Sequence, residues 1–202
     1  MKVLVAFASA LLAAAPAFGV TIVYTTSLSG PNENPPVASA GIGVATVTVD
    51  TTAHTLRVQE TFSGLTSGTT ASHIHCCNAP PATSGVATMT PTFSGLPLGV
   101  TSGSMDQTLD TLALSTYNAP FVTANGGTAV GAEAALFAGI AAGNAYVNIH
   151  TTQNPGGEIR GFLTPAAAVP EPETYALFLA GLASLGIVAR RRQRREAKRL
   201  TC

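Results

Sequence analysis

Residues Gly143–Leu163 read GNAYVNIHTTQNPGGEIRGFL. Within it, Tyr146–Thr151 and Glu158–Leu163 are short runs rich in strand-forming residues, and each predicts a β-strand. Between the two runs, Gly156 and Gly157 permit the positive φ angles that a tight hairpin turn requires. The stretch therefore predicts two short strands joined by a glycine-containing turn.

The same reading extends outward along the chain. Runs of Val, Ile and Thr predict further strands at Thr21–Ser29, Val44–Asp50, His54–Phe62, Ala71–His75, Val86–Thr90 and Val100–Leu109. Ala132–Ala142 has helical composition and predicts one short helix or a covering segment. Many short strands between Gly-rich turns are typical of antiparallel sandwiches and barrels. We expect a mainly β fold: an antiparallel β-sandwich or barrel-like single domain with one short helix, an N-terminal signal helix and a C-terminal transmembrane helix.

The N-terminus has the pattern of a signal peptide. Met1-Lys2 supplies a minimal positive charge, and Val3–Ala15 is an apolar run of suitable length. Small residues then place cleavage after Ala17 or Gly19. We expect residues 1–19 to be a signal peptide and residues 20–165 to be the β domain.

The C-terminus has three parts in a fixed order. Pro170-Glu171-Pro172 lies in an expected linker, 166–174, and an uncharged apolar run follows at Tyr175–Ala189. That run would give about 22–24 Å of helix, somewhat short of a bilayer core of ~30 Å. Seven basic residues follow within 190–202, and positive charge of this kind stays on the cytoplasmic side. We expect a transmembrane helix at 175–189 and a basic cytoplasmic tail at 190–202.

The charge of the chain is divided unevenly. The formal net charge is +0, but residues 18–169 contain only Arg57 and Arg160 against seven acidic residues, which gives −5. Affinity for nucleic acid depends on Lys and Arg at phosphates. We therefore expect no nucleic-acid partner.

Cysteines are few. Cys76 and Cys77 are adjacent in a domain expected in an oxidising compartment, and Cys202 lies beyond the basic block. A vicinal disulfide, intermolecular pairing, metal ligation and two small buried thiols all remain open for Cys76 and Cys77.

The histidines form the main candidate site. His73 and His75 are two positions apart, so on a strand they face the same side. His150 ends another predicted strand, and if the two strands are neighbours, three imidazoles converge. Three histidines with an open position suit Zn or Cu. The alternative is structural, with ring N–H groups donating to loop carbonyls. His54 is isolated and expected to face solvent.

Glu158 and Arg160 also share one side of a predicted strand. They form either a polar ligand site or a clamp that fixes the turn at Gly156-Gly157. Arg57, Glu33 and Glu60 are the other candidate partners for these charges.

The C-terminal pattern of Pro170-Glu171-Pro172, apolar helix and arginine cluster resembles a PEP-CTERM sorting signal. The resemblance implies a Gram-negative-type bacterium, recognition by a membrane-embedded exosortase, cleavage near the motif, and release or transfer to the cell surface. Proteins with such signals are often linked to exopolysaccharide and biofilm matrices.

The body of the chain resembles a CHRD domain, the module named for its repeats in chordin. The blocks that carry the resemblance are Leu28–Gly30 with Glu33–Pro36, Ser72–His75, Gly143–Thr151 and Asn154–Gly161. The resemblance implies an extracellular, mostly β domain.

Three functions follow as hypotheses. The first is an exported surface or matrix module without catalysis, sorted by an exosortase and binding exopolysaccharide or a surface protein. The chain carries no GxSxG, Walker or HExxH motif, so we expect no enzyme. The second is a metal-binding protein that uses His73, His75 and His150, with Zn or Cu as the only expected cofactor. The third, a dismutase-like enzyme, has only weak support, because further metal histidines are missing.

Overall fold

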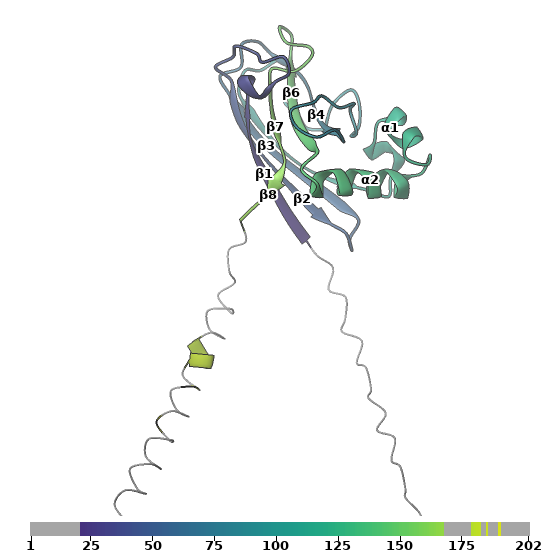
Figure 1. Cartoon of the computed structure of the whole chain (residues 1–202). Helices are drawn as coiled ribbons and strands as arrows, with labels where there is room; N and C mark the ends of the chain where they lie inside the picture. Colours follow the sequence, from purple (N-terminus) through teal and green to yellow (C-terminus); the bar gives the residue numbers. More distant parts are fainter. Residues whose placement is uncertain (1–20, 168–178, 183–184, 186–189, 191–202) are drawn as a thin grey trace, which may run out of the picture. The chain divides into compact units, whose positions relative to one another are not determined.

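The computed structural model describes residues 21–167, 179–182, 185 and 190 (Figure 1). Its strands are β1 Thr21–Ser29, β2 Ile42–Asp50, β3 Thr55–Ser63, β4 Thr69–Cys76, β5 Gly103–Asp110, β6 Ala145–Thr151, β7 Ile159–Phe162 and β8 Thr164–Pro165. Its helices are α1 Ala119–Ala124 and α2 Ala129–Ala141, with 3-10 turns η1 Gly30–Asn32 and η2 Leu114–Thr116.

The strands form one antiparallel sheet in the order β4-β6-β7-β1-β2-β3-β5, and β8 pairs with β1. The sheet curls into a half-barrel. The Ser72 hydroxyl on β4 donates to Glu60 Oε1 on β3 at 2.8 Å, although these strands lie near opposite ends of the strand order. The prediction of a mainly β antiparallel domain is confirmed. Of the two predicted arrangements, a sandwich or a barrel-like domain, the observed one is a single curled sheet that forms a half-barrel.

Alternation along β2 and β3 produces one wall of the core. Ala45, Val47 and Val49 on β2 are buried, and the residues between them are more exposed. On β3 the buried members include Leu56 and Val58. Successive side chains point to opposite faces of a strand, so this wall has an apolar inner face and a solvent-facing outer face.

Strand β6 is different, because all seven of its residues are buried. Val147 and Ile149 face the apolar core. Tyr146, Asn148 and His150 alternate with them and therefore face the other side. That outer side of β6 must be covered by something other than the sheet.

The helices close the core beside β4 and β6 (Figure 1). Leu136 and Ile140 of α2 are fully buried and join the same core as Ile74 of β4. The Thr128 hydroxyl caps α2 by accepting from the Gly131 N–H. The helix predicted at Ala132–Ala142 is thus present and starts earlier, and the shorter α1 was not predicted.

The prediction of a strand at Val86–Thr90 is wrong, since this segment makes only isolated β-bridges. It runs beside β4, but threonine hydroxyl groups accept hydrogen bonds from backbone N–H groups of the β4 edge. The Thr88 hydroxyl accepts from the Ile74 N–H, and the Thr92 hydroxyl accepts from the Ser72 N–H, each at 2.9 Å. Covering a sheet edge in this way prevents pairing with another chain.

Residues 167–202 form a second unit. The signal peptide predicted at 1–19 and the motif Pro170-Glu171-Pro172 lie outside the described residues. Positions 179–182, 185 and 190, at or beside the predicted transmembrane run, are helical. Within the portion of the chain that is described, no helix has the length and apolar character needed to cross a membrane.

Candidate metal centre

Pairing of β4 with β6 brings the three predicted histidines together. His150 lies opposite Ala71, and Asn148 lies opposite His73. His73 and His75 alternate with the core residues Ile74 and Cys76, so both point to the side of the sheet away from the apolar core. The condition that the sequence left open, that the two strands be neighbours, is therefore met.

The three imidazole rings form a compact triangle. Ring centroids are 5.9 Å apart for His73 and His75, 5.2 Å for His73 and His150, and 5.8 Å for His75 and His150. Each ring offers one nitrogen, and these nitrogens lie within 4.8 Å of one another. All three residues are buried, with exposed fractions of 6%, 8% and 9%.

One nitrogen of each ring bonds to a backbone carbonyl of a covering loop. His73 Nε2 lies 2.7 Å from the Pro91 oxygen, and His75 Nδ1 lies 2.9 Å from the Ser84 oxygen. His150 Nδ1 lies 3.0 Å from the Pro155 oxygen. A carbonyl oxygen only accepts, so the nitrogen facing it carries the hydrogen.

The second nitrogen of each ring, namely His73 Nδ1, His75 Nε2 and His150 Nε2, is buried and has no hydrogen-bond partner within the described part of the chain. In a neutral imidazole this second nitrogen holds a lone pair. Burial lowers the pKa of all three rings, and that of His75 to about 4. The rings are therefore neutral at pH 7, with three lone pairs in one small space.

This arrangement is the one that metal-binding histidines use, in which the ring N–H donates to a carbonyl and the other nitrogen binds the ion. Metal–nitrogen distances of about 2.0–2.1 Å place three ligand nitrogens roughly 3.5 Å apart. The present separations, up to 4.8 Å, are wider than that value.

The cysteines do not belong to this cluster. Cys76 and Cys77 form a disulfide with each other, one of the four alternatives left open by the sequence. Cys76 faces the apolar core. A Cβ added at Gly139 would collide with both sulfur atoms, so α2 packs directly on the disulfide. Cys202 lies outside the described residues.

Arg160 lies beside the histidines on β7, opposite Asn148. It is 1% exposed, and its Nε and Nη2 donate to the carbonyl oxygens of Asn32 and Pro81 at 2.6 and 2.9 Å. Its guanidinium carbon lies 4.8 Å from the ring centre of Tyr146, and Nε lies 3.7 Å from Glu33 Oε2. Burial raises the pKa of Glu33 to about 7, although the Arg160 charge acts in the opposite direction.

Glu158 does not pair with Arg160. Instead it is a fully buried acceptor that joins two loops to the end of β6. Ser39 Oγ and Thr151 Oγ1 donate to it at 2.6 Å, and Thr66 donates through its N–H at 2.7 Å and its hydroxyl at 2.8 Å. Burial raises the pKa of Glu158, but these hydrogen bonds outweigh burial and hold the pKa below its ordinary value. The residue clamps the loop that contains Gly157.

Two residues of the site were not predicted. Tyr146 stacks on His75 with ring centres 4.8 Å apart and planes 8° apart, and its hydroxyl accepts from the Ser84 N–H at 3.1 Å. Asn148 lies between His73 and Arg160 across the strands, and an added Cβ at Gly157 would collide with its amide. Polar residues at every second position of a strand with an apolar alternate face are the signal that could have revealed them.

The isolated histidine is placed elsewhere. His54 lies just before β3, and its side chain is 42% exposed. It is nevertheless partnered, because its Nδ1 lies 3.0 Å from a carboxylate oxygen of Glu133 on α2. Arg57 is likewise distant from the cluster in the sheet order and pairs with Asp106 of β5 on the solvent-facing side.

Comparison with protein families gives two matches. A CHRD domain matches residues 24–163, and a PEP-CTERM protein-sorting motif matches residues 168–195. Neither is an enzymatic family. No curated protein and no solved structure matches the chain. Both resemblances seen in the sequence are confirmed, and the sorting motif implies export and processing by a membrane-embedded exosortase. The CHRD match spans more than half of the chain, and the chain therefore belongs to the CHRD domain family.

Proposed function

We propose that this protein is an exported metal-binding protein of the cell envelope, in which His73, His75 and His150 hold one Zn or Cu ion. The observation that carries the proposal is the set of three buried ring nitrogens without partners. A buried polar atom without a partner is costly and rare in native proteins. Here the three rings that carry such atoms each offer one nitrogen within 4.8 Å of the nitrogens of the other two.

The hydrogen-bonding state of the rings supports the proposal further. If the cluster only tied loops to the sheet, one carbonyl bond for each ring would suffice, and nothing would require the free nitrogens to face one another. Instead, each carbonyl fixes the hydrogen on the nitrogen that it contacts. The remaining nitrogen of each ring is left ready to bind a metal ion.

The test is metal analysis of the protein purified after export. We expect one equivalent of zinc or copper for each chain, and an increase in the unfolding temperature when metal is added to the chelated protein, because an ion that binds only the folded state stabilises it. His150→Ala should lose the metal and the metal-dependent stabilisation together.

His54→Ala is the matched control, since it also removes one histidine but lies outside the cluster. Its metal content should equal that of the unchanged protein. Circular dichroism of the metal-free variants verifies that each one folds. Absence of stoichiometric metal from a folded protein after zinc and copper have both been offered would contradict the proposal.

The destination of the protein is also part of the proposal. We infer that the exosortase step leads to the cell surface or the extracellular matrix, after removal of the basic tail. The sorting motif supports this inference. Mass spectrometry of the mature protein tests it, because a C-terminus near Pro170-Glu171-Pro172 is expected and a mature chain that retains Arg190–Arg195 would contradict it.

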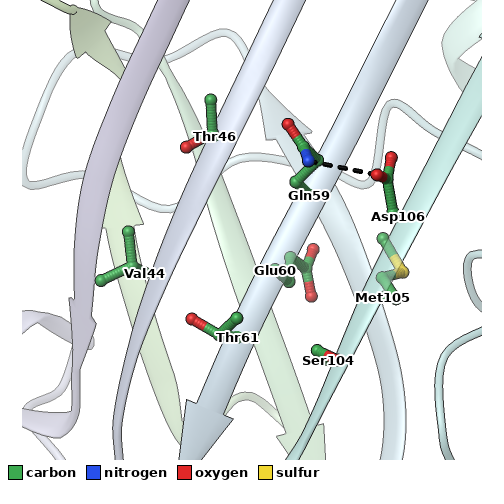
Figure 2. A pocket seen from close by; sticks show the side chains of 8 residues that line it. All are labelled: Val44, Thr46, Gln59, Glu60, Thr61, Ser104, Met105 and Asp106. Atoms are coloured by element: carbon green, nitrogen blue, oxygen red, sulfur yellow. Dashed lines mark hydrogen bonds between the residues drawn. The ribbon is translucent and has the colours of Figure 1, made fainter.

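A second candidate function, binding of exopolysaccharide, is favoured by a hollow on the outer face of β2, β3 and β5. The hollow has a volume of about 480 Å³ and is lined mainly by hydroxyl, amide and carboxylate side chains (Figure 2). Gln59 Nε2 on β3 donates to Asp106 Oδ2 on the paired strand β5 at 3.1 Å. Gln59→Ala should reduce retention of the protein on polysaccharide isolated from the same cells, and unchanged retention would remove this candidate.

A further inference from the structure

We infer that the three-histidine site selects monovalent copper, Cu(I), over the divalent ions Zn(II) and Cu(II). This inference rests on the proposed metal-binding function and names the ion that the site takes. Three properties of the site support the inference: the charge of the ligands, the number of ligands, and the positive charge of Arg160 beside them.

The ligand set contains no anion. Among the His, Cys, Asp and Glu side chains of the described residues, one group has ligand atoms close enough to hold a single ion, namely His73, His75 and His150. Two buried acidic residues have other partners, since Glu158 accepts hydrogen bonds from Ser39, Thr66 and Thr151, and Glu33 faces Arg160. Adjacent sulfur is also excluded, because Cys76 is in a disulfide and faces the core. No protein group of the site would offset the charge of the ion.

Burial makes that charge decisive. The three free nitrogens have almost no contact with solvent. The cost of moving an ion out of water rises with the square of its charge, so a divalent ion loses far more solvation than a monovalent one. Binding to neutral imidazoles offsets only part of the hydration energy that a divalent ion loses. A monovalent ion of suitable ligand preference therefore fits the site better.

The number of ligands leads to the same ion. Zinc in proteins is almost always four-coordinate, and a three-histidine zinc site adds a water or substrate as its fourth ligand. Here three carbonyls from two covering loops hold the rings, those of Ser84 and Pro91 between β4 and β5 and that of Pro155 between β6 and β7. The second nitrogen of each ring is shielded from solvent. Imidazole is a good ligand for copper, and Cu(I) accepts three ligands without a fourth.

Arg160 adds a positive charge beside the site. Its guanidinium carbon lies 4.8 Å from the ring centre of Tyr146, and that ring stacks on His75 with ring centres 4.8 Å apart. A cation at the metal position is repelled by this charge, and the repulsion is twice as large for a divalent ion as for a monovalent ion at the same distance. Arg160 is held by loop carbonyls and by the Tyr146 ring, so it cannot move away without breaking those contacts.

The experiment measures the affinity of the chelated, exported protein for each ion by competition with colorimetric chelators. Copper is held as Cu(I) by excess ascorbate under nitrogen, and Zn(II) and Cu(II) are measured without reductant. We expect one Cu(I) for each chain, with a dissociation constant at least about tenfold lower than those for Zn(II) and Cu(II), a difference of ~1.4 kcal/mol. X-ray absorption should show copper with three nitrogen ligands.

His150→Ala should abolish tight Cu(I) binding, and His54→Ala should leave it unchanged. Arg160→Lys keeps a positive charge while removing the planar guanidinium, and it should retain the preference for Cu(I) if it folds. Equal or tighter binding of either divalent ion, or a four-coordinate copper spectrum, would overturn the selectivity and leave the metal-binding function standing. Failure of all three ions to bind the folded protein would overturn the metal-binding function itself.

Discussion

The two sides of the curled sheet use their outer faces in opposite ways. On β2 and β3 the inner face is apolar and the outer face meets solvent, with Val44 49% exposed. On β4 and β6 the inner face is equally apolar, but loops cover the outer face and bury polar side chains there. The comparison shows that burial alone does not identify the core, since β6 is buried on both faces and only one of them is hydrophobic.

The difference has an energetic meaning. Charged and polar groups on the β2–β3 side keep their hydration, so their contacts contribute little. The same kinds of group under the loops of the β4–β6 side have lost water and depend on the partners that the protein supplies. Variants on the two sides should therefore differ greatly in effect.

The largest difference is expected between two arginines. Arg160→Met removes a buried guanidinium. It leaves the carbonyls of Asn32 and Pro81 without their donor, and it leaves Glu33 without the positive charge 3.7 Å away. Loss of one member of a buried charge pair costs about 3–5 kcal/mol, which urea denaturation measures directly. Arg57→Met on the solvent side breaks a pair that is about half exposed, and its unfolding curve should hardly move.

A double variant sharpens this result. Arg160→Met combined with Glu33→Gln removes both charges, so it should recover part of the stability lost in the single variant. Equal losses for Arg160→Met and Arg57→Met would show that the two sides of the sheet do not differ as described.

The second prediction concerns a carboxyl group in the apolar core. Burial raises the pKa of Glu60 from the ordinary value of 4.5 to about 7, although the hydrogen bond from Ser72 acts against the rise. Because the folded-state pKa lies above the unfolded one, stability from this group is complete below pH ~4.5 and declines until pH ~7. Glu60→Gln should remove this decline and stabilise the protein by up to about 3 kcal/mol above pH 7.

The measurement is the free energy of unfolding of both proteins from pH 4 to pH 8. The buried histidines change stability in the opposite direction over this range, because their folded-state pKa values are lowered. The difference between variant and unchanged protein cancels that contribution. If the two pH profiles run parallel, Glu60 does not titrate as described.

The smallest effect is expected on the outer face of β2 and β3. Thr46→Val and Thr61→Val replace hydroxyls that line the hollow on that face. Substitutions at such surface positions usually change stability by no more than about 0.5 kcal/mol. Thermal unfolding of the double variant should match that of the unchanged protein, and a loss of several kcal/mol would mean that this face is covered in solution.

Much of the fold could be predicted from the sequence, because local alternation carries it. The first strand was predicted with the bounds Thr21–Ser29 that the structure has, and β2 and β3 differ by only one or two residues at their ends. The strand prediction for Val86–Thr90 was wrong because this segment contacts β4 through a side chain, with the Thr88 hydroxyl accepting from the Ile74 N–H. Such a tertiary contact is not contained in the local sequence pattern. Whether the strands form a sandwich or one curled sheet depends on long-range packing, and the sequence left that choice open.

For the site, the sequence identified the three histidines but left their convergence conditional. The spacing of His73 and His75 gave their common face, whereas the approach of His150 depends on strand order. Glu158 was expected near Arg160, yet it holds Ser39 and other loop residues instead. Which loop covers which face is decided by contacts between segments far apart in the chain, so no local pattern could supply these partners.

The pairing of β4 with β6 also determines when the proposed ion can be acquired. His75 and His150 are far apart in the sequence, and only the register between the two strands brings their rings together. A chain that crosses a membrane in an extended form has no such register, so it has no cluster to load with metal on the cytoplasmic side. Any ion at this site is taken from the compartment in which the sheet assembles, and its identity reflects the supply there.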